Sequence, residues 1–233
     1  MTKSKSAPRV IAIVQARMGS SRLPLKSLLC LRDYPIADWV GRRLQRANEL
    51  DGLIFAIPDT SLDDTLAEHL RRKNLDYMRG SENDVLDRFC KAAELAKADF
   101  IVRVCADNPL VAPEAVDALI KFFKSSKADY AYNHIPRGNL WPDGLGAEIL
   151  SRDTLENIAA LAKTPAQREH CFNYIWDNPE QWKIETFDPE ETWLRRPDLK
   201  LDIDTADDFR KMSQLSINPG MNLKEIIQAC EIM

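Results

Sequence analysis

The sequence predicts an α/β protein of three layers, in which helices cover both faces of a mostly parallel sheet. Short apolar runs rich in Val and Ile, such as residues 10–14, have the length and composition of strands buried on both faces. Segments whose apolar residues recur at helical spacing lie between these runs. This alternation of strand and helix is typical of parallel sheets joined by right-handed crossovers.

The first half of the chain contains four predicted strands, each followed by a predicted helix. Each helix carries an apolar stripe that faces inward. Pro113 suits a first helical position, where the missing N–H of proline costs little. The strands are expected at residues 10–14, 52–57, 75–78 and 100–105, and the helices are expected to start near residues 36, 61, 84 and 113.

The second half is less regular. Residues 130–146 contain two prolines and three glycines and are interpreted as a long loop, which in a compact domain is usually functional or mobile. We predict a flexible polar tail over residues 1–8 and a single domain over residues 9–233, with a lid or dimerisation segment at 130–180. The remaining helices are expected at 151–161, 165–176, 205–215 and about 223–230, and a strand at 182–187.

Composition excludes several classes of protein. The hydrophobic content of 45% and charged content of 29% are ordinary for a globular protein, and the net charge of −4 gives no general affinity for nucleic acid. The five cysteines show no Cys-x-x-Cys spacing, so we expect free thiols in a reducing cytoplasm and no zinc site. We expect no signal peptide and no membrane span.

A basic loop follows the first strand. Residues 17–26 contain three cations and no acid, and a loop at the carboxyl end of a buried strand is where α/β sheets bind ligands. Such a loop suits an anion, most simply a chain of phosphates, although a solvated basic loop is the alternative. The spacing fits neither a Walker loop nor the Gly-x-Gly-x-x-Gly of dinucleotide folds. The cations are Arg17, Arg22 and Lys26.

Two acidic segments are candidates for a metal site. Asp107 directly follows the fourth strand, where a carboxylate can hold Mg²⁺, but Asp and Asn before Pro are also ordinary turn residues. Residues 201–208 contain four acids. Asp207 and Asp208 are explained by the start of a helix. Asp202 and Asp204 are explained less well, because alternation places both on one face of a strand.

Residues 15–26, which read Gln-Ala-Arg-Met-Gly-Ser-Ser-Arg-Leu-Pro-Leu-Lys, resemble the signature of cytidylyltransferases that make CMP-activated sugar acids, in particular the SpsF-like branch of spore coat polysaccharide biosynthesis. The resemblance implies a Rossmann-like nucleotide-diphospho-sugar transferase fold with this loop wrapped around the triphosphate of CTP. Leu25 stands where the family pattern has Gly. The implied nucleotide contacts in the loop are Gln15, Ala16, Arg17, Gly19, Ser20, Arg22 and Lys26.

The resemblance also assigns a Mg²⁺ site. The family's Gly/Ala-Asp-x-Pro-Leu motif corresponds to residues 106–110, which makes Asp107 a metal ligand. Its Ile/Val-Asp-Thr-Pro-Glu-Asp motif corresponds to residues 203–208, which makes Asp204 the second ligand. Bound metal would bridge phosphate oxygens, and the loop cations would stabilise the departing pyrophosphate. The residues implied in catalysis are Arg17, Lys26 and Asp107.

Two further features concern the nucleotide. Residues 79–88 resemble the family's Arg-Gly-Ser-x-x-Asp-Val-Leu-Asp-Arg, which implies that Arg79, Ser81 and Asp84 touch base or ribose. The alternative is a helix capped by Ser81 or Asn83, with an exposed pair of acid and base at residues 87 and 88. Arg103 interrupts an apolar strand, and a charge there needs a ligand or an acidic partner.

The acceptor side is implied by two further motifs. Residues 142–148 resemble Pro-Asp-Gly-x-Asp-x-Glu, so Asp143 and Glu148 would face the acceptor, and Gly146 stands where the family commonly has Asp. Residues 168–170 match Arg-Glu-His, which implies that Arg168 and His170 contact the acceptor or a dimer partner.

The sequence therefore predicts a Mg²⁺-dependent cytidylyltransferase of the cytoplasm, a homodimer by family resemblance. CTP and an acidic sugar or similar anionic acceptor would give a CMP conjugate and pyrophosphate, in surface polysaccharide or glycoconjugate biosynthesis. One alternative is a nucleotide-sugar-dependent glycosyltransferase with the loose Asp-x-Asp at residues 202–204. The other is a non-catalytic binding protein, which the departures at Leu25 and Gly146 favour. The sequence does not name the acceptor.

Overall fold

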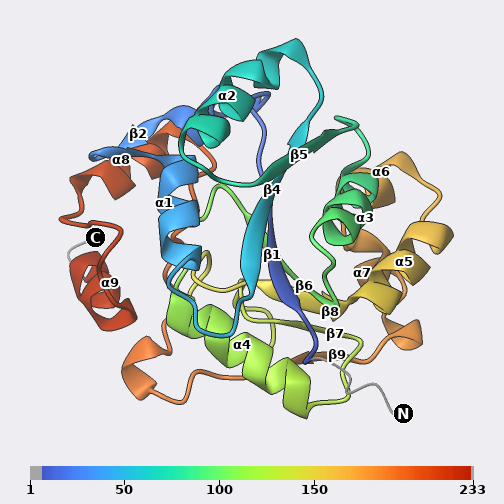
Figure 1. Ribbon diagram of the computed structural model, residues 1–233. Coiled ribbons are helices and arrows are strands. Elements are labelled where there is room, and N and C mark those ends of the chain that lie inside the picture. Colours follow the sequence, from blue (N-terminus) through green and yellow to red (C-terminus); the bar gives the residue numbers. More distant parts are fainter. Residues whose placement is uncertain (1–6, 232–233) are drawn as a thin grey trace.

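The computed structural model describes residues 7–231 and has a seven-stranded sheet at its centre (Figure 1). All neighbouring strands are parallel except that β8 is antiparallel to both β6 and β7. The predicted α/β class with a mostly parallel sheet is confirmed. The spatial order is β5 (Tyr77–Gly80), β4 (Gly52–Pro58), β1 (Val10–Gln15), β6 (Phe100–Cys105), β8 (Glu148–Ser151), β7 (Tyr130–Tyr132) and β9 (Ile184–Thr186).

Strand β1 is central because it pairs with β4 on one side and β6 on the other. Its side chains alternate between the two faces. Val10, Ala12 and Val14 belong to one core cluster, and Ile11 and Ile13 belong to the other. Both clusters exclude water from the strand, which explains why the run has no polar residue until Gln15.

Helices cover both faces of the sheet and complete the three layers (Figure 1). One face packs against α1 (Ile36–Leu44), α2 (Asp64–Arg72) and α4 (Pro113–Ser125). The opposite face packs against α3 (Val85–Leu95), α5 (Arg152–Leu161) and α7 (Asn173–Asp177), and α6 (Pro165–Glu169) lies beside α3.

A third apolar cluster joins the end of the chain to its beginning. It packs α8 (Ala206–Gln214) and α9 (Leu223–Cys230) against a two-stranded hairpin of β2 (Cys30–Leu31) and β3 (Tyr34–Pro35). Within residues 7–231, four short 3-10 helices complete the elements, and they are η1 (Lys26–Leu28), η2 (Ser61–Asp63), η3 (Pro179–Gln181) and η4 (Thr192–Leu194).

Three predicted elements were wrong in detail. The loop predicted at residues 130–146 begins with β7, a strand of three residues that is too short to stand out in the sequence. The single helix predicted at 165–176 is two helices, because Cys171 and Phe172 turn into the core between them. The β2–β3 hairpin was not predicted at all. The strand predicted at 75–78 forms two residues later, at 77–80.

Residues 1–6, most of the predicted flexible tail, lie outside the described residues. The single domain over residues 9–233 and the homodimer stay predictions. Among residues 7–231, no helix has the length and apolarity needed to cross a membrane.

Candidate active site

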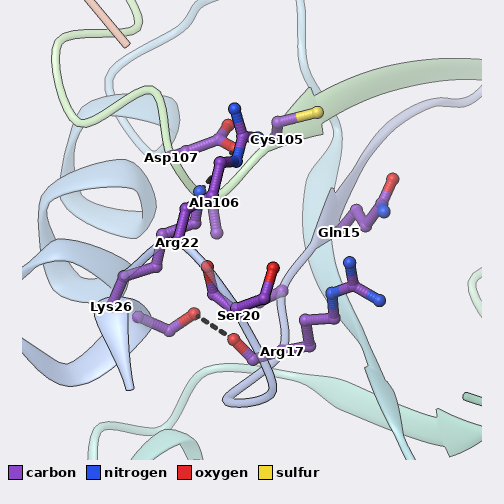
Figure 2. A pocket seen from close by; sticks show the side chains of 11 residues that line it. Gln15, Arg17, Ser20, Arg22, Lys26, Cys105, Ala106 and Asp107 are labelled. Atoms are coloured by element: carbon purple, nitrogen blue, oxygen red, sulfur yellow. Dashed lines mark hydrogen bonds and ion pairs between the residues drawn. The ribbon is translucent and has the colours of Figure 1, made fainter. Parts of the chain in front are cut away.

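A cavity of about 210 Å³ opens where β1 and β6 end at the same edge of the sheet (Figure 2). The residue that ends β1 and the basic loop after it form most of the wall. The remainder comes from the end of β6 and the turn that follows. The lining residues are Gln15, Ala16, Arg17, Ser20, Ser21, Arg22, Lys26, Ser27, Cys105, Ala106 and Asp107.

The basic loop is held in a defined shape by hydrogen bonds that its backbone donates or accepts. The Leu25 N–H donates to the carbonyl oxygen of Met18 at 3.1 Å and closes the loop on itself. The Met18 N–H donates to the buried carboxylate of Asp63 at 2.8 Å, and the Ser27 hydroxyl donates to the carbonyl of Arg17 at 3.0 Å. These bonds favour the binding interpretation of the loop over that of a loose, solvated segment.

Leu25 adopts the left-handed conformation, with φ 60° and ψ 16°. A residue with a Cβ pays roughly 1–2 kcal/mol for this conformation, whereas Gly adopts it readily. The position where the family pattern has Gly is therefore a position where the backbone favours Gly. Leu25 keeps the same loop shape at a conformational cost.

Lys26 lies between two carboxylates that are far apart in the sequence. Its ammonium is 2.9 Å from Asp107 Oδ2 and 3.5 Å from Asp204 Oδ1, and it also donates to the carbonyl of Ile203 at 3.1 Å. Arg22 donates from both terminal nitrogens to the two oxygens of Asp204, each at 2.9 Å. The predicted convergence of the basic loop with Asp107 and Asp204 is present in the structure.

Backbone pairing explains how Asp204 reaches this place. The Ile203 N–H donates to the carbonyl of Asp107 at 2.8 Å, and the Leu201 N–H donates to the carbonyl of Asp143 at 3.0 Å. The extended segment 199–204 thus runs between the two turns. Gly144 permits this approach, because a Cβ there would lie 2.8 Å from the backbone nitrogen of residue 202 and its φ is +87°.

The two carboxylates fit a shared Mg²⁺ ion. Both already face one cation, the Lys26 ammonium, and carboxylate oxygens are the ligands that Mg²⁺ prefers. Within residues 7–231 no group of three or more His, Cys, Asp or Glu side chains is arranged to hold a metal. Asp107 and Asp204 would therefore supply two ligands, and nucleotide phosphates and water would supply the others, as is usual for Mg²⁺.

Gln15 and Arg17 lie across the cavity from Asp107 (Figure 2). Arg17 is 3.7 Å from Glu169 of α6, and its side chain is 40% exposed, so it can turn toward a ligand. Gly19 is exposed at the tip of the loop, beside Glu82, and is not part of the cavity wall.

The residues predicted to touch base or ribose have partners within the protein. Arg79 lies 3.2 Å from Asp59 and 2.7 Å from Asp64. The Ser81 hydroxyl accepts from the N–H of Asp84 at 3.2 Å. These three predicted contacts lie outside the wall of the cavity at the end of β1, and their role toward a nucleotide stays a prediction.

The same turn shows a helix cap that differs from the predicted one. Asp84, rather than Ser81 or Asn83, caps α3 by accepting from the N–H of Asp87 at 2.9 Å. Arg168 of α6 contacts the other oxygen of Asp84 at 2.5 Å. The expected exposure of residue 88 was wrong, because Arg88 is fully buried and donates to backbone carbonyls of the turn.

Arg103 has an acidic partner, which was one of its two predicted alternatives. It forms an ion pair with Glu148, and the Tyr130 hydroxyl donates to the other oxygen of the same carboxylate. Burial by itself raises the pKa of Glu148, but the charges of Arg103 and His134, together with the hydrogen bonds from Tyr130 and Arg103, outweigh burial and lower the pKa. Glu148 is therefore a buried anion beneath the cavity, and not part of its wall.

Asp143 lies close to the two proposed metal ligands. Burial, and then the charge of Asp202, raise the pKa of Asp143 to about 6, with smaller contributions from Asp107 and Asp204. Arg168 is tied to Asp84, and His170 is exposed at the end of α6. Of the four residues predicted on the acceptor side, the structure thus brings only Asp143 close to the pair of acids.

Gly146 has a steric explanation. A Cβ at this position would lie 2.2 Å from the backbone oxygen of Asn133, so no side chain fits without movement of the backbone. The packing of this turn therefore leaves no room for the Asp that the family commonly has at this position.

Several residues of the cavity were not predicted. Ser21, Cys105 and Ala106 are simply neighbours of predicted residues. Ser27 follows Lys26, and its hydroxyl could have marked it as a candidate cavity residue. Asp63, which holds the basic loop through Met18, lies 45 residues away and carries no sequence signal of that role.

Comparisons with known proteins agree with the resemblance to cytidylyltransferases. A sequence profile described as "Cytidylyltransferase" matches residues 11–233. Spore coat polysaccharide biosynthesis protein SpsF of Bacillus subtilis (strain 168) is 33% identical over 216 residues, which cover 91% of this chain and 88% of that protein. An uncharacterised protein of Methanocaldococcus jannaschii is 36% identical over 207 residues, which cover 89% and 83%.

A solved structure of similar shape is that of a cytidylyltransferase from Leptospira borgpetersenii. Its TM-score is 0.87 with 25% sequence identity, and the match covers 97% of this chain and 94% of that one. The correspondence extends over nearly the whole chain.

Proposed function

Because the chain belongs to the cytidylyltransferase family, we propose that it transfers CMP from CTP to an acidic sugar or related anionic acceptor, with Mg²⁺, and releases pyrophosphate. The observation that carries the proposal is the convergence of Lys26 with Asp107 and Asp204 at the end of β1. Cations for a triphosphate and carboxylates for its metal ion are thereby present in one cavity.

In the proposed reaction, an acceptor oxygen attacks the α-phosphorus of CTP. A P–O bond to the acceptor forms and the bond to the β-phosphate breaks, so that pyrophosphate leaves with the electron pair, and the proton of the acceptor hydroxyl passes to water. Arg17, Arg22 and Lys26 bind the phosphate oxygens and stabilise the negative charge that moves to the leaving group. Bound Mg²⁺ would supply further positive charge at the phosphates, with Asp107 and Asp204 holding it.

Ligand binding requires these side chains to exchange partners. In the structure, the cations and the acids neutralise each other, with Arg22 on Asp204 and Lys26 on both carboxylates. The Arg22 side chain is 63% exposed, and exposed ion pairs contribute only about 0–1 kcal/mol. A metal ion with a triphosphate can therefore replace the Arg22–Asp204 pair at little cost, whereas Lys26, whose side chain is 14% exposed, is held more firmly by its two carboxylates.

The family relationship to SpsF supports a role in surface polysaccharide or glycoconjugate biosynthesis. The glycosyltransferase alternative receives less support from the structure. Asp202 pairs with Lys200 at 2.9 Å, whereas Asp204 pairs with Arg22, so the two acids of the Asp-x-Asp contact different cations.

Pyrophosphate release, measured with each of the four NTPs and a panel of sugar acids, tests the proposal. We expect release with CTP, Mg²⁺ and at least one sugar acid, and its loss in Lys26→Met. Lys183→Met is the matched control, since Lys183 is a half-exposed lysine that pairs with Glu185 away from the cavity. Consumption of a nucleotide sugar without pyrophosphate release would contradict the proposal, as would CTP binding without turnover of any acceptor.

A further inference from the structure

The Gln15 side chain has a fixed orientation at the end of β1. Arg103 donates from one terminal nitrogen to Gln15 Oε1 at 3.3 Å. A guanidinium has donors only, so the amide oxygen of Gln15 must face Arg103 and its NH₂ group must face away. Within residues 7–231 this NH₂ group has no protein partner and is not enclosed, and Gln15 lines the cavity. It is therefore available as a donor to a ligand.

Arg103 is itself held from below. It pairs with buried Glu148, which also accepts from Tyr130, and its guanidinium carbon lies 5.6 Å from the centre of the Phe172 ring. Breaking a buried pair leaves an uncompensated charge, so this arrangement resists change. The contacts run from the core to the cavity and end at the Gln15 amide.

The position of Gln15 relative to the cations indicates which part of the ligand it meets. Figure 2 shows Lys26, Arg22 and Asp107 gathered on one side of the cavity, and Gln15 together with Arg17 on the other. If the triphosphate lies on Lys26 and Arg22, the nucleoside extends away from these two cations, toward the wall that Gln15 shares with Arg17. Gln15 is the polar, uncharged side chain on the opposite wall.

We propose that Gln15 reads the base of the nucleotide, donating its NH₂ to the acceptor edge of cytosine at O2 and N3, and that Arg103 is a positioning residue for that amide. The inference rests on the proposed cytidylyltransferase function. Cytosine accepts at N3, whereas uracil carries a hydrogen there and donates. A donor held at this place therefore favours CTP over UTP, because uracil leaves it facing another donor.

Gln15→Glu is the direct test, since it keeps the shape of the side chain and replaces the NH₂ donor by an oxygen acceptor. Affinities for CTP and UTP are measured by calorimetry with Mg²⁺, and the ratio of the two is compared. The added negative charge weakens both nucleotides alike, because they carry the same triphosphate. We expect the preference for CTP over UTP to fall about tenfold or more, the value of one lost hydrogen bond with an unpaired group.

Further variants separate the effect on base preference from the effect on phosphate binding. Gln15→Leu should also lower the CTP preference, but should leave the affinity for inorganic tripolyphosphate within about twofold of wild type. Arg103→Lys keeps the charge beside Glu148 but removes the fixed fork of donors. It should therefore lower the CTP preference in the same direction, again with tripolyphosphate binding retained. Gln45→Glu, at an exposed position directly after α1, is the control and should change nothing.

The outcomes distinguish the inference from the function it rests on. An unchanged ratio of CTP to UTP affinity in folded Gln15→Glu and Gln15→Leu would overturn the role of Gln15. Should Arg103→Lys fail to fold, the two Gln15 variants still decide that role. Wild-type protein that binds tripolyphosphate but shows no preference for CTP over any other NTP would instead overturn the proposed function.

Discussion

Two sets of ion pairs in this protein share the same chemistry and differ in burial. The first, which we call the cavity ion pairs, joins Arg22 and Lys26 to Asp107 and Asp204. The second is the buried pair of Arg103 and Glu148. The two sets differ most in their acids, because the side chains of Asp107 and Asp204 are 26% and 23% exposed and that of Glu148 is 4% exposed. Among the cations, Arg22 is 63% exposed, whereas Lys26 at 14% resembles Arg103 at 17%.

This difference in burial decides what each set can do. Water can replace the partners of an exposed pair, so the pair contributes little to stability and its members are available for a ligand. In a buried pair, neither charge can be left alone without a large desolvation cost. The cavity ion pairs are thus suited to exchange, and the buried pair is suited to hold a neighbouring side chain in one orientation.

The largest expected effect is on stability, from Glu148→Ala. Loss of the Glu148 carboxylate leaves Arg103 buried without an acidic partner, so we expect the free energy of unfolding to fall by about 3–5 kcal/mol. Asp204→Asn, which removes a charge from the cavity ion pairs, should change it by less than about 1 kcal/mol. Urea denaturation of both variants measures the contrast. Equal losses in the two would show that burial does not separate the two regions.

Lys26→Met should change catalysis strongly and stability little. Removing one cation that stabilises the leaving group should lower kcat about 10²–10³-fold, by analogy with loss of a single transition-state donor. The free energy of unfolding should change little, because the side chain only balances two partly exposed acids. Steady-state kinetics with CTP, alongside Lys183→Met, give the measurement. A kcat within threefold of wild type would remove Lys26 from the catalytic set.

Asp143 should make stability depend on pH. Its pKa is raised to about 6, so the folded state binds the proton more tightly than the unfolded state does. The stabilisation from this proton is complete below about pH 4 and is lost as the pH rises through 6. Asp143→Asn should therefore match wild type at pH 4 and exceed it at pH 7 by on the order of 1–2 kcal/mol. A constant difference across this range would show that Asp143 does not titrate as described.

The smallest expected effect comes from Leu25→Gly. The substitution removes the cost of a left-handed residue with a Cβ, but it also increases the entropy of the unfolded chain. We expect a net gain of about 0.5–1 kcal/mol in the free energy of unfolding, without loss of CTP binding. Thermal unfolding measures it, and Leu95→Gly serves as a control at an exposed helical position, where Gly should destabilise. A less stable Leu25→Gly would mean that its side chain contributes contacts that outweigh its backbone conformation.

Much of the fold could be predicted from local patterns. The buried run at residues 10–14 and the strand at 52–57 are apolar on both faces, as is the strand at 100–105 apart from Arg103, and this is visible in the sequence. Strand β7 has three residues, and β8 is antiparallel to its neighbours, so neither repeats the earlier pattern. Such elements are specified by pairing with distant strands, which a local pattern does not contain.

The candidate site was predictable in part for the same reason. The basic loop is continuous in sequence, so its residues could be identified directly, and their role toward a nucleotide stays a prediction. The contacts between residues that are distant in sequence could not be predicted. Asp63 holds the loop from 45 residues away, and Glu148 lies beneath Arg103 rather than on the surface of the site. Residue types indicated charge, and only the packing showed which charges are buried.

The central claim is that the cavity ion pairs exchange their partners for CTP and Mg²⁺. Calorimetric titration of CTP with and without Mg²⁺, into wild type and into Asp107→Asn/Asp204→Asn, tests it most directly. The account predicts that Mg²⁺ strengthens CTP binding about tenfold or more in wild type and less than twofold in the double variant. Equal strengthening by Mg²⁺ in both proteins would contradict it.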